Sequence, residues 1–217
     1  MPALQNRTLD TLFCSLSPTD FIFVVFQSKG SSFVSRVPFC HLHFHTCYSL
    51  LDSAVKVKDA VAAAKEMGME HLAMTDHGVL YGAVEFYKAC MGAGIKPIIG
   101  SEVIMDNEDT RLTLLAMNNE GYQNITRIVS LVFTEGRADP VNHGTPVIKR
   151  SHILEHAAGV IVLLTEKSDV GQALVGSMPE KADELLTEWQ AQFGDRLRSE
   201  EHTSELQSPD HPRMPSS

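Results

Sequence analysis

The chain has 217 residues, of which 43% are hydrophobic and 21% are charged, and its formal net charge is −9. This length and balance are normal for one soluble globular domain with a real core. A phosphate-binding surface needs clustered lysines and arginines, so the acidic balance argues against a stand-alone DNA-binding protein.

Three zones succeed one another along the chain. Residues 1–38 show no helical or strand period that pairs them with the next zone, and we interpret them as an N-terminal extension. This extension is either native or translated upstream sequence. Residues 39–197 alternate strand-like and helix-like segments. Residues 198–217 are polar and lack core-forming side chains, so we expect a disordered tail. Within it, RSEEHTSELQS at Arg198–Ser208 resembles a translated sequencing adapter.

The middle zone predicts a parallel sheet, because strand-like runs alternate with helix-like runs. Either a doubly wound sheet or a closed barrel satisfies the right-handed crossovers that such a chain requires. The expected strands are Phe39–His45, His71–Thr75, Lys96–Met105, Leu112–Ala116 and Val160–Leu164. The expected helices are Val57–Met67, Ala83–Met91, Glu120–Phe133, Ser151–His156 and Pro179–Phe193.

The cysteines and the apolar runs bear on the compartment. Cys14, Cys40, Cys47 and Cys90 form no C-x-x-C pair, and we interpret them as free thiols in a reducing compartment. The apolar run FIFVVF at Phe21–Phe26 is far shorter than the roughly 20 residues that span a bilayer, so no membrane partner is expected. The first residues lack the order of a secretory signal, so the cytoplasm is the expected location.

The most informative local motif is HLHFH, which contains His41, His43 and His45. Side chains of a strand alternate between faces, so the three imidazoles are expected on one face. A row of neutral imidazoles suits a divalent transition metal. A solvent-facing edge strand with polar residues outside explains the motif equally well.

Further acidic and imidazole groups follow the next predicted strands. Asp76 and His77 end the second strand, Ser101 and Glu102 are expected to end the third, and Asp52 follows the first. In parallel α/β architectures functional groups gather at the C-terminal ends of strands. Mixed histidine and carboxylate ligands suit zinc, manganese or iron better than magnesium or calcium. Two or more such ions can activate water for phosphoryl displacement.

Together these motifs resemble the polymerase and histidinol phosphatase (PHP) family. The matching stretches are HFH with the following YS, then TDHG, then GSE, and the joining stretches AVEFY, GIKPIIG and LLAMNNEGYQN are similar to those of bacterial replicative polymerase alpha subunits. The resemblance covers about residues 39–197. It implies a distorted seven-stranded (β/α) barrel, incomplete here at its C-terminal end.

The resemblance also implies which residues bind metal. The family's ligand positions fall on His43, His45, Asp52, His77 and Glu102. Asp76 lies beside one of them and is expected to support a ligand or to cap the core. His41 is an additional histidine that we interpret as structural.

Departures from the family pattern predict a degenerate site. Metal-complete members carry a histidine at the start of the fourth strand, where this chain has Arg111, and a cysteine after the strand matching Val160–Leu164, where it has TEKSD at Thr165–Asp169. A final Asp-x-His pair lies beyond the region of resemblance. The fixed charge of Arg111 repels a metal ion. We expect a zinc or manganese ion to be sub-stoichiometric or absent, and any residual ion to use His43, His45, His77 and Glu102.

The function implied is that of a structural and scaffolding domain within the alpha subunit of a bacterial replicative DNA polymerase. The implied partners are the rest of that subunit, the proofreading exonuclease subunit, and DNA only through the full-length parent. Nucleotidyl transfer belongs to a palm domain outside this sequence, so no catalytic residue is assigned. The alternative is a metal-dependent phosphoesterase or a 3′–5′ proofreading exonuclease that acts through the same histidines and carboxylates.

Overall fold

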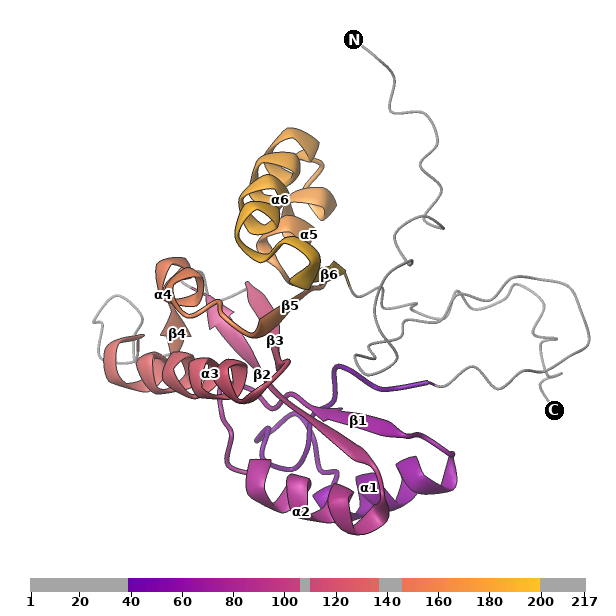
Figure 1. Cartoon of the computed structure of the whole chain (residues 1–217). Helices are drawn as coiled ribbons and strands as arrows, with labels where there is room; N and C mark the ends of the chain where they lie inside the picture. Colours follow the sequence, from indigo (N-terminus) through magenta and orange to yellow (C-terminus); the bar gives the residue numbers. More distant parts are fainter. Residues whose placement is uncertain (1–38, 106–109, 137–145, 200–217) are drawn as a thin grey trace, which may run out of the picture.

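A computed structural model describes residues 39–105, 110–136 and 146–199, in which six α-helices flank a six-stranded mixed sheet (Figure 1). The strands are β1 (His71–Met74), β2 (Lys96–Met105), β3 (Arg111–Ala116), β4 (Val147–Ile148), β5 (Val160–Leu164) and β6 (Leu197–Ser199). The helices are α1 (Val57–Glu66), α2 (Ala83–Ala93), α3 (Asn119–Leu131), α4 (Arg150–Glu155), α5 (Asp169–Val175) and α6 (Pro179–Phe193), with a short π-helix η2 (Val132–Gly136) and a 3₁₀-helix η4 (Gly194–Arg196).

The sheet runs in the order β1-β2-β3-β5-β6, and β4 pairs with the end of β2, on the edge opposite β3. β1–β2, β2–β4 and β5–β6 are parallel, whereas β3 is antiparallel to both β2 and β5. The prediction of a purely parallel sheet is therefore wrong. Only residues 106–110 connect β2 to β3, and a parallel crossover needs about a dozen residues or more, so β3 must run back along β2.

The long strand β2 changes partners halfway along its length. Lys96–Ile99 pair with β1, and Gly100–Ile104 pair with β3. A Cβ atom at Gly100 would lie 2.3 Å from the carbonyl oxygen of Leu114, so glycine permits the close approach at the change of partner. The expectation that Glu102 ends its strand is wrong, because β2 continues to Met105.

The predicted strand Phe39–His45 is also wrong, because this segment is irregular. It nevertheless lies beside β1, where Ala73 N–H donates to the His41 carbonyl at 2.9 Å and Thr75 N–H donates to the Phe44 carbonyl at 2.8 Å. The N–H of Phe44 bonds to the hydroxyl of Thr75 at 2.8 Å rather than to a backbone carbonyl. In a regular β-ladder the N–H of Phe44 would bond to a backbone carbonyl, and here a side-chain hydroxyl takes that place.

Two large apolar clusters hold the helices on the sheet. One joins α1 and α2 to β1, where Phe86 and Met74 are fully buried, and Figure 1 shows these two helices together on one side of β1. The other joins α3, α4, α5 and α6 to the rest of the sheet, with Trp189 and Phe193 buried from α6. The helical period in the sequence predicted α1, α2 and α6, and these helices are confirmed.

The two ends of the chain lie mostly outside the described residues. This holds for the extension 1–38 and for residues 200–217, while Arg198 and Ser199 belong to β6, which pairs with β5. In the part of the chain that the structure describes, no helix is long and apolar enough to cross a bilayer.

Three of the four cysteines lie in the described part of the chain. Cys40, Cys47 and Cys90 are free, and burial raises the pKa of both Cys40 and Cys90 to about 11. These two thiols therefore stay protonated at neutral pH. Cys14 lies outside the described residues.

The start of α3 packs so closely on the chain before β5 that only glycine fits there. A Cβ atom at Gly121 would lie 1.9 Å from the carbonyl oxygen of Gly159, and both partners are backbone. We expect Gly121→Ala to lower the free energy of unfolding by about 2–3 kcal/mol. Urea unfolding of the 217-residue chain measures this loss.

Gly92→Ala is the matched control, because Gly92 lies within α2 and a Cβ atom added there would meet no other atom within 4 Å. Alanine at this position should raise the free energy of unfolding by about 0.5–1 kcal/mol. Equal effects of the two substitutions would contradict the close approach of Gly121 to Gly159.

Candidate metal site

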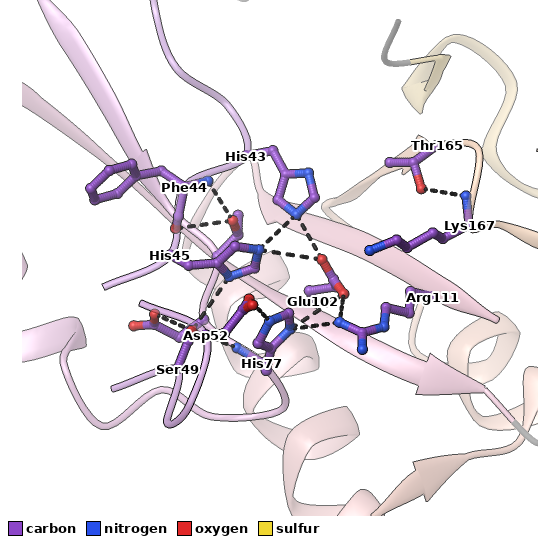
Figure 2. A network of polar contacts seen from close by, with 12 residues as sticks. His43, Phe44, His45, Ser49, Asp52, His77, Glu102, Arg111, Thr165 and Lys167 are labelled. Atoms are coloured by element: carbon purple, nitrogen blue, oxygen red, sulfur yellow. Dashed lines mark hydrogen bonds and ion pairs between the residues drawn. The ribbon is translucent and has the colours of Figure 1, made fainter. Parts of the chain in front are cut away.

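The five expected ligands lie in one continuous network of side chains (Figure 2). His43 Nε2 is 2.7 Å from Glu102 Oε2 and 3.1 Å from His45 Nε2. On the other side of the carboxylate, His77 Nδ1 is 3.3 Å from Glu102 Oε1. The second nitrogen of His77 lies 2.5 Å from Asp52 Oδ2. Glu102 is 4% exposed and forms the centre of the network.

Three neighbouring segments supply these side chains. His43 and His45 come from the irregular segment beside β1, and Asp52 comes from the turn that follows it. His77 follows β1 and forms an isolated parallel bridge with Glu102, which lies within β2. Because β2 continues beyond its last pair with β1, Glu102 lies past the end of β1, where the histidines gather.

A buried carboxylate, Asp76, holds the turn that carries these groups. It accepts hydrogen bonds from Thr46 N–H at 2.6 Å, from the Thr46 hydroxyl at 2.7 Å and from the Ser49 hydroxyl at 2.6 Å. Its backbone carbonyl accepts from Glu102 N–H at 3.1 Å. Asp76 thus ties the turn to β2 through hydrogen bonds from its side chain and its backbone.

Two sets of side chains have the spacing to hold an ion. The first is His43, His45 and Glu102, and the second is His45, Asp52 and His77; within each set the ligand atoms lie within 4.8 Å of one another. Tetrahedral zinc with bonds near 2.1 Å needs ligand atoms about 3.4 Å apart. The first set, with separations of 2.7–3.5 Å, fits one ion after small adjustments. Both sets include His45.

A fixed positive charge lies inside the same network. Arg111 Nη1 is 3.0 Å from Glu102 Oε1 and 3.5 Å from His77 Nδ1. The register pairs Arg111 with Ile104, two residues beyond Glu102, so the guanidinium reaches the carboxylate diagonally across the two strands. One oxygen of Glu102 is therefore already engaged by a cation.

The electrostatics of the network follow from these contacts. Burial alone would raise the pKa of Glu102, but hydrogen bonds from His43 and His77 outweigh it and hold the pKa well below its ordinary range. The hydrogen bond and charge of His77 also lower the pKa of Asp52. The site therefore keeps both carboxylates ionised at neutral pH.

His77 carries a testable pH dependence. Hydrogen bonding to Glu102 raises the pKa of His77 above 6.5, burial opposes this, and the hydrogen bond to Asp52 adds to the rise. A raised folded-state pKa stabilises the fold fully below the unfolded value and loses that contribution as pH rises through the folded value. In metal-free buffer, stability should fall as pH rises from about 6.5 toward 9. His77→Gln should flatten this slope in urea unfolding, and an unchanged slope would contradict the assignment.

Sequence reasoning missed two further groups near the network. Thr113 pairs with Glu102 across the strands and is 1% exposed, and its hydroxyl has no hydrogen-bond partner among the described residues. Figure 2 shows the side chain of Lys167 extending toward Glu102 from the chain after β5. Lys167 lies in the run where the family pattern has a cysteine. The missing cysteine was the only feature of the sequence that pointed to this run. His41 lies apart from the network, with its ring edge-on to Phe39.

The fold and the site define a mixed α/β protein with a histidine–carboxylate cluster of the kind that binds divalent ions. The model of the PHP domain family matches residues 41–203, so the chain belongs to the PHP family. This agrees with the resemblance seen in the motifs.

Curated relatives define the branch of the family. The chain is 40% identical over 165 residues to DNA polymerase III subunit alpha of Pseudomonas fluorescens, a match that covers 73% of this chain and 14% of that protein. It is 37% identical over 169 residues to the subunit of Escherichia coli K12, with 75% and 14% covered. The chain is thus homologous to a region spanning about one seventh of these subunits. Among solved structures, an amidohydrolase from Chromobacterium violaceum matches with a TM-score of 0.43 at 17% identity, covering 70% of this chain and 73% of that one.

Proposed function

We propose that this chain is a structural PHP domain of a bacterial DNA polymerase III alpha subunit, with a degenerate site that holds at most one divalent ion. The observation that carries the proposal is the contact of Arg111 with Glu102 at 3.0 Å. A second metal cation beside Glu102 would lie close to the positively charged guanidinium. The two cations would repel each other in this partly buried site, so Arg111 disfavours the second ion.

The ion that remains would be held by His43, His45 and Glu102, with His77 and Asp52 completing the polar surroundings. Nitrogen and carboxylate donors suit zinc or manganese. Zinc or manganese so bound would supply an activated water and a positive charge toward phosphate. The chain's own residues hold the ligand rings in place, and Arg111 presents a fixed charge at the same carboxylate.

The partners belong to the same proposal. We assign this domain a bracing role within the parent polymerase, with the proofreading exonuclease subunit as a second partner and DNA contacted only through the full-length protein. The net charge of −9 supports the last point, because a phosphate-binding surface needs clustered positive charge. The polymerase reaction, nucleotidyl transfer, is proposed for the parent alone, and the cytoplasm is its proposed location.

The described sheet would then be part of a distorted seven-stranded (β/α) barrel of the PHP type. The proposed domain spans residues 39–197, and β6 extends two residues beyond it. The proposal that the tail translates a sequencing adapter is tested by the nucleotide sequence of the source. Ordinary genomic codons for Arg198–Ser208 would refute that part.

A metal-dependent phosphoesterase or 3′–5′ exonuclease is the second candidate function. Two observations favour it: the two overlapping ligand sets, and the hydroxyl of Thr113 directly across from Glu102, which lacks a partner among the described residues. A buried hydroxyl without a partner is costly, so a bound water or phosphate oxygen there would relieve the penalty.

One experiment separates the two functions. Purified chain is loaded with manganese or zinc, dialysed, assayed for bound metal, and then tested for hydrolysis of a chromogenic phosphate ester. The scaffold predicts at most one ion and no turnover above background. Two or more tightly bound ions, with turnover abolished by His45→Ala and retained by His41→Ala, would establish the enzyme instead.

A further inference from the structure

The hydroxyl of Ser49 lies between the ring of His45 and the carboxylate of Asp76, and both Ser49 and Asp76 are buried. Ser49 Oγ is 2.6 Å from Asp76 Oδ1 and 3.3 Å from His45 Nδ1. The backbone N–H of His77 approaches the same oxygen at 3.2 Å. One hydroxyl thus links a buried carboxylate to a ring of the candidate metal site, and Figure 2 shows Ser49 beside His45.

Counting hydrogens fixes the direction of each of these bonds. A serine hydroxyl has one hydrogen to donate and two lone pairs, and a carboxylate can only accept. The hydrogen of Ser49 therefore points at Asp76, which is also its shortest contact. The N–H of His77 can only donate, so it occupies one lone pair. The remaining contact requires that Nδ1 of His45 carries the hydrogen and donates it to Ser49.

The surroundings of Asp76 agree with this direction. Its two oxygens accept from the N–H of Thr46 at 2.6 Å and from the hydroxyl of Thr46 at 2.7 Å. The same Thr46 hydroxyl accepts from Tyr48 N–H at 3.3 Å, so its own hydrogen is available for Asp76. Each of these groups donates to Asp76, which matches an acceptor-only carboxylate.

We infer that Asp76 and Ser49 form a relay that keeps the hydrogen of neutral His45 on Nδ1 and leaves Nε2 bare. Nε2 is the atom that faces His43 at 3.1 Å and Glu102 at 3.5 Å. Ser49 and Asp76 are therefore positioning residues that select the ligand atom of His45. The inference that Nε2 of His45 binds metal rests on the proposed one-ion site. The position of the hydrogen on Nδ1 does not depend on that proposal.

The relay has a consequence for how many ions fit. Both candidate ligand sets need His45, and the relay leaves that ring only one bare nitrogen. One nitrogen lone pair coordinates one ion. The two sets therefore compete for the same atom, which limits occupancy independently of the charge on Arg111.

The test reads the hydrogen position directly. Ring ¹⁵N shifts of the full 217-residue chain are recorded without metal at about pH 8, above the ordinary histidine pKa, and the His45 signals are identified by their loss in His45→Gln. Wild type should show a protonated Nδ1 and a bare Nε2. Ser49→Ala should give a mixture of the two neutral forms. A wild-type ring with its hydrogen on Nε2 overturns the relay whether or not any variant folds.

Ser53→Ala is the matched control, because the Ser53 hydroxyl donates to the backbone carbonyl of His45 at 2.9 Å and not to its ring. It should leave the His45 signals unchanged. Zinc affinity should fall about 10–100-fold in Ser49→Ala and stay level in Ser53→Ala. Loss of affinity with an unchanged His45 signal overturns the relay. If wild type takes up no zinc but the signals move as expected, the relay stands and the one-ion site fails.

Discussion

Replacing Arg111 with histidine should raise the affinity of the chain for zinc or manganese by at least about tenfold, or about 1.4 kcal/mol. The change removes a charge 3.0 Å from Glu102 Oε1 and frees that oxygen. It also adds an imidazole close to His77, whose Nδ1 lies 3.5 Å from the guanidinium. Arg111 is 32% exposed along its side chain, so solvent screens part of the repulsion and the expected gain stays modest.

Isothermal titration of metal into the purified chain measures this gain. Arg127→His is the matched control, because Arg127 contacts Asn124 on α3 and lies outside the site. It should leave the metal affinity unchanged. An affinity in Arg111→His equal to that of wild type would show that the guanidinium is not what limits the site.

Replacing Glu102 with alanine should cost the fold about 3–5 kcal/mol, the range for truncating one partner of a buried ion pair. The carboxylate is nearly fully buried and is contacted by His43, His77 and Arg111. Without it, the positive charges of Arg111 and of protonated His77 lie close together with no anion between them. Glu102→Gln keeps the shape and loses the charge, so it should fall between wild type and alanine.

The midpoint and slope of urea unfolding measure this effect. Glu85→Ala provides the control, because Glu85 is exposed and accepts a hydrogen bond from the Tyr48 hydroxyl at 3.0 Å. A surface contact of this kind contributes little to stability, because solvent competes for both groups. Equal losses in the two alanine variants would mean that Glu102 is not the centre of a buried charge network.

Much of the fold could be predicted from the period of the hydrophobic residues and from the residues that begin and end helices. Pro179 begins α6 and Gly194 follows it, and the run between them has a helical period that buries Trp189. The alternation of strands and helices suggested parallel pairing throughout, and that failed at β3. Whether a connection turns back or crosses over depends on its length and on the pairing partner, which β-strand patterns alone do not encode.

The site could be assembled from the sequence only in part. His43, His45, His77 and Glu102 were named from motifs, and the structure brings their side chains into one network. The role of Ser49 could not be found this way. A hydroxyl becomes informative only when all its partners are known, because the direction of each hydrogen bond follows from the count of donors and acceptors.

Irregular backbone explains the failed strand at the first motif. Alternation in HLHFH predicted a regular strand, yet Thr75 bonds to Phe44 through its side chain and interrupts the ladder. His43 and His45 still meet, with ring centroids 4.8 Å apart. The predicted common face of three imidazoles is therefore kept only for His43 and His45, which specific hydrogen bonds to β1 and to the turn hold together, whereas His41 packs against Phe39.

Anomalous scattering from crystals of the chain grown with excess manganese or zinc would test the central claim most directly, because it counts the ions and locates them. We predict one peak at most, bounded by His43, His45 and Glu102, with Arg111 still in contact with the carboxylate. Two or three peaks around Glu102, with the guanidinium turned away, would contradict the degenerate one-ion site.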